Sequence, residues 1–301
     1  MISKIFLLKI SKKNSLTMKD FGMTKHALVV EGGAMRGIFA TGVLDAFLEH
    51  DFNPFDFTIG VSAGSVVLMG YLCKDYQRNY KVITEYARSK DFINYKRFVE
   101  GGNLIDIDWL WKASIEHLPL ALHEYEKQGV PLFATTTNVV TGDPSYIKVT
   151  RENLTEVMTA TCALPIVYKN FPQVNGIAMS DGGIADPIPV IEAYNKGARE
   201  ITVVLSHPQA LFAHNRQVPW LTRRIFKTQP VFAQEFLTKE SRYNKALYFI
   251  KNPPADCKIN AIIPDKNFQI KRLTKNLDKL DAGYQQGRNA GLSLVKSYSN
   301  H

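Results

Sequence analysis

A serine bracketed by glycines directly follows a short apolar run. The run Phe57-Thr58-Ile59 leads into Gly60-Val61-Ser62-Ala63-Gly64. Small neighbours let the backbone turn sharply from a strand into a helix, which leaves the serine hydroxyl exposed above the edge of a sheet. We therefore expect a strained elbow at Ser62, followed by a helix over residues 65–72. The pattern is typical of nucleophilic serines, and a plain helix N-cap is the alternative role for Ser62.

Short β-branched runs alternate with longer helical patterns from Ala27 onward, which predicts a doubly wound α/β sheet. Strands are expected at 27–30, 56–61, 131–138, 145–149, 176–179, 201–205 and 258–263. Helices are expected from about 38 to 48, at 65–72, 76–87 and 154–163, from Pro187 onward, and at 277–296, with irregular helical segments over 89–129. Gly283, Gly287 and Gly291 lie four residues apart in the last helix, which indicates close packing against a neighbour.

The chain has 301 residues and a formal net charge of +9, and the charge is unevenly distributed. Residues 1–25 contain six lysines and one acid, so we expect a basic, disordered N-terminal extension. Residues 26–301 are expected to form a single domain, because that length can bury a sizeable core and shows no repeat or linker. The apolar run at residues 5–8 is too short for a cleaved secretion signal, with a signal anchor as the alternative.

A second basic stretch covers residues 216–251, with eight basic and two acidic side chains. It is either a patch that faces phosphates or the solvated faces of ordinary helices. Nothing in the chain suggests a nucleic-acid partner, and no apolar run approaches the ~18–20 residues of a membrane span. The three cysteines form no C-x-x-C pair. We therefore expect free thiols, no metal, no cofactor and a reducing, cytoplasmic location.

A glycine-rich turn follows the first predicted strand and is the candidate oxyanion hole. It reads Gly32-Gly33-Ala34-Met35-Arg36-Gly37. Backbone N–H groups of Gly32, Gly33 and Ala34 can turn toward one point, and the following helix start adds partial positive charge. A dinucleotide-binding turn is the alternative, but it would require glycine in place of Ala34. Arg36 either contacts a phosphate or anchors the loop.

The candidate base is Asp181, which ends a predicted strand and precedes Gly182-Gly183. The two glycines allow a tight fold that brings the carboxylate toward a neighbouring strand end, where open α/β sheets place their ligands. A turn aspartate is the alternative role. His207 and His214 follow Asp181 in the order that a Ser-Asp-His triad requires, but neither is framed by glycines.

Together these blocks resemble the signature blocks of the bacterial patatin-like phospholipases. The segment Ala160-Thr161-Cys162-Ala163-Leu164-Pro165 is similar to a fourth block of that family, with Thr161 in place of serine. The blocks span roughly residues 27 to 190, in the family's order. The family's oxyanion block usually has three consecutive glycines, whereas this chain reads Glu31-Gly32-Gly33.

The resemblance implies a three-layer α/β/α sandwich around a mostly parallel sheet, and calcium-independent hydrolysis of acyl esters. It implies a dyad of Ser62 as nucleophile and Asp181 as base, supported by Arg36 and the flanking glycines. Those supporting glycines are Gly37, Gly60, Gly64, Gly182 and Gly183. The expected substrate is a phospholipid, lysophospholipid or related acyl ester, with peripheral membrane contact.

Two other functions remain open. One is a triad carboxylesterase that uses His207 or His214. The other is a non-catalytic protein that binds anionic lipids through its basic stretches. Aromatic residues of the irregular segment could line an acyl pocket or a lid, or pack in the core; they are Phe92, Tyr95, Phe98, Trp109 and Trp111, with Leu110 beside them.

Overall fold

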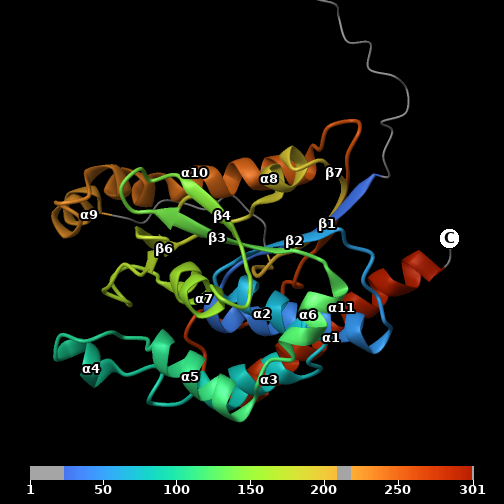
Figure 1. Ribbon diagram of the computed structural model, residues 1–301, viewed down its shortest axis with the longest axis horizontal. Helices are drawn as coiled ribbons and strands as arrows, with labels where there is room; N and C mark the ends of the chain where they lie inside the picture. Colours follow the sequence, from blue (N-terminus) through green and yellow to red (C-terminus); the bar gives the residue numbers. More distant parts are fainter. Residues whose placement is uncertain (1–23, 209–217, 300–301) are drawn as a thin grey trace, which may run out of the picture.

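The computed structural model describes residues 24–208 and 218–299 (Figure 1). The predicted N-terminal extension lies outside the described residues, apart from Thr24 and Lys25, and so does His214. Lys25 already belongs to the first strand, so the sheet begins one residue earlier than the expected domain boundary.

An eight-stranded sheet forms the middle layer, with the order β5-β6-β3-β2-β1-β7-β8 and β4 paired to β3. The parallel pairs are β3 with β2, β2 with β1, β1 with β7, and β7 with β8. Pairs involving β4, β5 and β6 are antiparallel. The strands are β1 (Lys25–Val30), β2 (Phe57–Val61), β3 (Leu132–Asn138), β4 (Pro144–Lys148), β5 (Gln173–Val174), β6 (Ile177–Asp181), β7 (Ala198–Val204) and β8 (Lys258–Ile262).

Helices cover both faces of the sheet, which confirms the α/β class and the three layers (Figure 1). Helices α1, α2, α7 and α11 pack on one face, and α8 and α10 on the other. No helix of the described residues is long and apolar enough to cross a membrane. The helices are α1 (Gly37–Glu49), α2 (Ala63–Leu72), α3 (Arg78–Lys81), α4 (Tyr95–Val99), α5 (Ile107–His117), α6 (Leu122–Gln128), α7 (Leu154–Cys162), α8 (Val190–Asn195), α9 (Pro219–Ile225), α10 (Pro230–Lys251) and α11 (Leu277–Ser299), with a 3-10 turn Ala34–Arg36 and a π-helical turn Val82–Tyr86.

One predicted helix start is wrong. The helix expected from Pro187 begins only at Val190, after Pro189. The physical reason is the second proline, which disfavours the helical conformation for the residue before it. Residues 182–189 instead form turns, in which the Asp186 N–H donates to the Gly182 carbonyl at 2.9 Å.

Helices α1 and α11 approach closely because glycines face the contact, as the glycine spacing predicted. A methyl group built on Gly42 would overlap the Tyr284 carbonyl oxygen, and one on Gly287 would overlap the Phe39 carbonyl oxygen. The same pair of helices is held by the Tyr284 hydroxyl, which donates to the buried Asp45 carboxylate at 2.8 Å. The C-terminal helix is therefore part of the same hydrophobic core as α1 and α2.

This contact predicts the effect of Gly287→Ala. Alanine is the better helix former by about 1 kcal/mol, but the added methyl has no room beside the Phe39 carbonyl. We expect the steric overlap to outweigh the gain in helix propensity and to lower the free energy of unfolding by roughly 1–3 kcal/mol. Urea denaturation measures this free energy, with Gln285→Ala on the exposed side of α11 as the control. Equal or greater stability of Gly287→Ala would contradict the close packing.

Candidate active site

Two strands meet end to end along one edge of β3, and the predicted site residues lie at their junction. Strand β2 runs parallel to β3 as far as Val61, which pairs with Thr135. The next residue, Thr136, pairs with Asp181 at the end of antiparallel β6. Strand β4 pairs with both threonines and so occupies the opposite edge. Ser62, which follows Val61, therefore lies across the junction from Asp181.

The turn at Ser62 has the strained backbone of an elbow. Its φ of 52° and ψ of −127° are outside the ordinary regions for a residue with a side chain. Helix α2 begins at once with Ala63, two residues before the predicted start. Ser62 occupies the N-cap position, but its hydroxyl makes no capping hydrogen bond. The hydroxyl is thus available for other contacts.

The elbow glycines lie where side chains would not fit. A methyl group on Gly60 would lie 2.5 Å from the Ser65 Cα, inside the turn itself. One on Gly64 would overlap the Val30 carbonyl oxygen at the end of β1. These two contacts explain why glycine stands on both sides of the serine. Gly37 is less constrained, because a methyl there would make an ordinary 3.5 Å contact with the Ala63 Cβ.

Asp181 is buried, and its Oδ1 accepts the Gly183 N–H at 2.8 Å. Burial raises the pKa of Asp181 above its ordinary value, while the side chain of Ser62, the Gly183 N–H and the nearby Arg272 and Lys239 oppose the rise. The Ser62 side chain thus interacts with the Asp181 carboxylate and favours its ionised form. A buried carboxylate beside a serine hydroxyl can accept the serine proton.

The backbone around Asp181 is fixed from three sides. Its N–H donates to the Ala163 carbonyl at 3.1 Å, and its carbonyl accepts the Thr137 hydroxyl at 2.8 Å. Gly182 follows so close to β3 that a methyl group would overlap the Thr135 carbonyl oxygen. The Asp-Gly-Gly segment therefore does more than turn the chain, because it seats the carboxylate at the strand junction.

Thr161 links the elbow to the sheet, a role that the sequence did not predict. Its hydroxyl accepts the Ser62 N–H at 2.9 Å and donates to the Thr135 carbonyl at 2.6 Å. The hydroxyl is fully buried. The family's serine at this position would carry the same donor and acceptor, which explains why threonine can replace it.

Cys162 lies beside Ser62, which the sequence gave no reason to expect. Burial raises the pKa of its thiol to about 12, and the side chain of Ser62 opposes the rise. The thiol is thus protonated at neutral pH and adds no charge beside Ser62. Across the described ranges, no three His, Cys, Asp or Glu side chains gather as metal ligands.

The glycine loop reaches the nucleophile through Gly32. A methyl group on Gly32 would lie 2.7 Å from the Val61 carbonyl oxygen and 2.9 Å from the Ser62 Cβ. Ala34 has a φ of +50°, which turns the loop into the 3-10 turn before α1. The N–H groups of Gly32, Gly33 and Ala34 donate to no acceptor among the described residues. They are available to a negatively charged oxygen beside Ser62.

A buried carboxylate holds the base of this loop. Glu31 accepts the Ser206 N–H at 2.7 Å, and its charge raises the pKa of the nearby Tyr243 hydroxyl after burial. The Ser206 hydroxyl donates to the Gly32 carbonyl at 2.8 Å. Burial raises the pKa of Glu31, and the positive charge of Arg36 opposes the rise. Arg36 therefore stabilises the loop through Glu31.

Arg36 also keeps one unused donor. Its buried Nε has no hydrogen-bond partner within the described residues, and it would lie 3.0 Å from a methyl group on Gly33. The side chain thus packs over the glycine loop, which agrees with an anchoring role and leaves one N–H group for a ligand.

Two cations from the C-terminal third of the chain lie near Asp181. Lys239 of α10 and the exposed Arg272 before α11 both interact electrostatically with Asp181. Burial, followed by the charge of Arg272, lowers the pKa of Lys239. The Arg272 carbonyl accepts the Met35 N–H of the glycine loop at 3.3 Å. Sequence reasoning missed both residues, because no local pattern links them to positions more than 50 residues away.

His207 is exposed and follows Ser206, the residue that holds Glu31. The side chain of Ser62 interacts with Asp181 and with Cys162.

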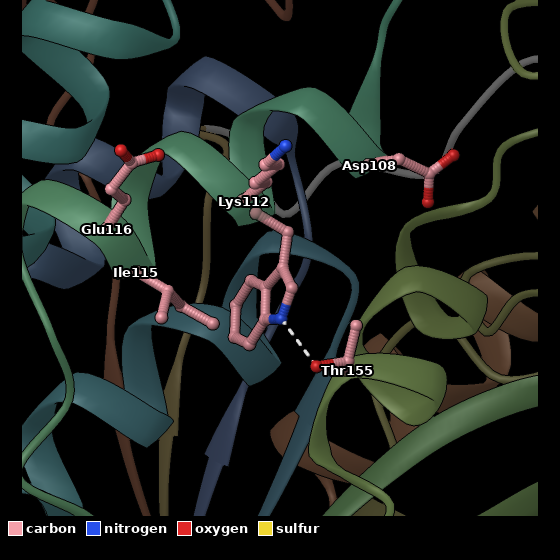
Figure 2. A pocket seen from close by; sticks show the side chains of 6 residues that line it. Asp108, Lys112, Ile115, Glu116 and Thr155 are labelled. Atoms are coloured by element: carbon pink, nitrogen blue, oxygen red, sulfur yellow. Dashed lines mark hydrogen bonds between the residues drawn. The ribbon is translucent and has the colours of Figure 1, made fainter.

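A pocket of about 420 Å³ lies elsewhere, between α5 and α7 (Figure 2). Its lining includes Trp111, whose indole N–H donates to the Thr155 hydroxyl at 3.0 Å, with Lys112 and Ile115 nearby. None of the predicted site residues borders it. Trp111 is buried in the main core, and Phe92 and Leu110 pack against that core, so these residues form no lid.

Two sequence families match different parts of the chain. The patatin-like phospholipase family matches residues 28–194, which contain the elbow, the glycine loop and Asp181. A domain family of unknown function matches residues 229–301, which contain Lys239 and Arg272.

Similar proteins match either most of the chain or a part of it. The uncharacterised protein YjjU of Escherichia coli K12 is 33% identical over 283 residues, which cover 92% of this chain and 78% of YjjU. Lysophospholipase NTE1 of Lodderomyces elongisporus is 28% identical over 195 residues, which cover 59% of this chain but only 12% of that enzyme. The crystal structure of VipD from Legionella pneumophila shares the fold, with a TM-score of 0.50 and 13% identity over 92% of this chain and 67% of VipD.

The Thr161 bridge leads to a stability prediction. Thr161→Val leaves the Ser62 N–H and the Thr135 carbonyl without their partner. We expect the free energy of unfolding to fall by about 1–3 kcal/mol, the usual cost of an unpaired buried group. Thr161→Ser keeps a hydroxyl at this position and should retain most of the parent protein's free energy of unfolding.

The neighbouring Thr135 provides a matched control for this experiment. Its buried hydroxyl has no hydrogen-bond partner in the described residues. Thr135→Val should therefore leave the urea midpoint unchanged or raise it. If Thr161→Val behaves like Thr135→Val, the hydrogen bond to Ser62 does not support the elbow.

Proposed function

Because the chain belongs to the patatin-like phospholipase family, we propose that it hydrolyses acyl esters of phospholipids or lysophospholipids through a Ser62–Asp181 dyad. Membership makes it a lipid acyl hydrolase, and the dyad and the substrate are the proposal. The observation that carries it is the junction on β3, where Ser62 follows Val61 and lies across from the buried Asp181. The Ser62 side chain favours the ionised Asp181 carboxylate, and the loop beside them has N–H groups that donate to no acceptor among the described residues.

The first half of the reaction forms an acyl enzyme. The Ser62 oxygen attacks the ester carbonyl carbon while its proton passes to Asp181. The N–H groups of Gly32, Gly33 and Ala34 hold the negative charge on the carbonyl oxygen, aided by the N-terminus of α2. When the tetrahedral intermediate collapses, the Asp181 carboxyl returns the proton to the leaving alcohol.

The second half of the reaction releases the acyl group. Asp181, ionised again, takes a proton from a water molecule that attacks the acyl carbonyl, and the same loop holds the oxyanion. Ser62 then recovers its proton as the fatty acid leaves. A triad would require an imidazole between Ser62 and Asp181, and the influence of the Ser62 side chain on the Asp181 carboxylate favours the dyad.

The lysophospholipase relatives support the lipid ester as substrate class. They match 59% of this chain, so the headgroup is not carried over from them. We further propose that residues 26–301 act as one domain. Helix α11 packs on α1, and the C-terminal third brings Lys239 and Arg272 to the dyad.

The dyad predicts which side chains are essential. Ser62→Ala and Asp181→Asn should each lower hydrolysis of a defined phospholipid or lysophospholipid on the order of 10⁴-fold, because both act as one catalytic unit. His207→Ala should stay within a few-fold of the parent protein. The measurement is release of fatty acid, together with covalent labelling by a fluorophosphonate.

The labelling experiment separates the alternatives. An adduct on Ser62 that also requires His207 would favour the triad. No adduct on the folded protein would favour a non-catalytic lipid-binding protein. Retained hydrolysis in Asp181→Asn would rule out Asp181 as the base.

The pH profile tests the role of Asp181. The base acts only when ionised, so kcat/KM should fall as the pH drops through the pKa of Asp181, which burial places above the ordinary 3.8. Lys239 favours the ionised form. Lys239→Gln should therefore raise the pKa of Asp181 and move the acidic limb to higher pH.

A surface lysine on the same helix is the control for the pH profile. Lys245 is exposed, and Lys245→Gln should leave the limb unchanged. A limb that stays in place or moves to lower pH in Lys239→Gln would contradict the electrostatic contact between Lys239 and Asp181.

A further inference from the structure

Helix α9 is folded with its apolar side outward. The helix buries Thr222, whereas Trp220, Leu221 and Ile225 are 66%, 42% and 46% exposed. A water-facing helix normally shows the opposite distribution, with apolar side chains toward the core. The exposed apolar side of α9 therefore suits an apolar partner outside the protein.

A strained turn presents another apolar side chain beside α9. Ile166 has a φ of +76°, a conformation that β-branched residues rarely adopt, and the residue is 42% exposed. The turn is fixed on both sides, because the Tyr168 N–H donates to the Leu164 carbonyl and the Val167 carbonyl accepts the Leu104 N–H. The strained turn thus leaves an isoleucine partly in solvent.

Both features border one hollow close to the dyad. Ile166 and Ile225, with Phe171 and Phe226, line a pocket of about 350 Å³. Its Pro165 follows Ala163 by two residues, and the Ala163 carbonyl accepts the Asp181 N–H. Figure 1 shows α9 at the same end of the molecule as β6, the strand that ends with Asp181.

The surroundings of this apolar surface are basic. Arg223, Arg224 and Lys227 are interleaved with it, and Lys169 lines the hollow. Residues 218–231 and 163–171 contain no aspartate or glutamate. No carboxylate of the described residues lies within salt-bridge distance of the three cations on α9 and its C-terminal turn. Apolar side chains with tryptophan among unpaired cations match the interface of a bilayer that contains anionic lipids.

We propose that α9 and the Ile166 turn form a docking surface for anionic membranes, which brings the Ser62–Asp181 dyad to its lipid. Trp220, Leu221, Ile225 and Ile166 insert at the level of the headgroups, and Arg223, Arg224 and Lys227 contact lipid phosphates. Binding of the membrane by this surface does not require catalysis. Its use in lipid hydrolysis rests on the proposed function.

Vesicle flotation tests the docking surface directly. The full chain with Ser62→Ala avoids lipid turnover, and vesicles contain phosphatidylcholine with or without phosphatidylglycerol. We expect binding to the mixed vesicles that weakens with salt. Adding Trp220→Ser and Ile225→Ser should reduce the partition coefficient on the order of tenfold. Arg223→Gln or Arg224→Gln should each reduce it roughly fivefold on anionic vesicles.

A matched control lies at the other end of α10. Tyr248 is 64% exposed, close to the value for Trp220, and lies roughly 27 Å along α10 from its first residue. Tyr248→Ser should bind vesicles like the parent protein. Equal binding by the Trp220/Ile225 and Tyr248 variants would overturn the proposal. If the parent protein does not bind vesicles, the proposal is overturned as well. The remaining explanation for the exposed surface is then a protein partner.

Tryptophan fluorescence and a soluble ester complete the test. Vesicles should shift the emission to shorter wavelength, and Trp220→Phe should abolish most of that shift while Trp109 and Trp111 remain. The ester assay uses the protein that keeps Ser62. In that background, the Trp220→Ser/Ile225→Ser double variant should keep its kcat/KM on a short-chain soluble ester but should lose hydrolysis of vesicle lipid. Equal loss on both substrates would point to misfolding and contradict docking. If no ester is cleaved, the proposed function fails while the flotation result still decides the docking surface.

Discussion

The shared edge of β3 is the constraint on which the rest of the site depends. Strand β2 stops at Val61, and the β3 backbone beyond Thr135 still needs hydrogen-bond partners because buried N–H and C=O groups are rarely left unpaired. Strand β6 supplies them from the opposite direction and stops at Asp181. Both strand ends thus meet at one point. A slip of one residue in either register would turn the side chains to the wrong face and separate serine from carboxylate.

The charges at this junction come from the whole chain. Two buried carboxylates, Glu31 and Asp181, lie near three cations, Arg36, Lys239 and Arg272. Glu31 is held by the Ser206 N–H at the base of the loop. Lys239 and Arg272 both favour the ionised form of Asp181. The C-terminal third is therefore an electrostatic part of the site.

The local parts of the site could be predicted from the sequence, and the partners in contacts between distant segments could not. Gly60 is required by a close approach within its own turn, so its place in the elbow pattern is visible in the chain. Gly32 and Gly182 are also visible as turn glycines, but the strands that they approach are not. We expected Asp181 at the end of a strand in a largely parallel sheet. The strand exists, but its antiparallel direction depends on which edge of β3 is vacant, which is a property of the sheet. Lys239 and Cys162 were missed for a similar reason, because their positions near Asp181 and Ser62 depend on the assembled fold.

Ala34, which follows the two loop glycines, shows how such distant contacts matter. It adopts a positive φ, which costs an ordinary residue about 1–2 kcal/mol relative to the favoured region and costs glycine almost nothing. The loop keeps its shape because the Arg36 N–H donates to the Gly33 carbonyl and the Met35 N–H donates to the Arg272 carbonyl. One of these bonds comes from the C-terminal third. The segment that brings two cations to the dyad thus also holds the loop in a conformation that its own sequence disfavours.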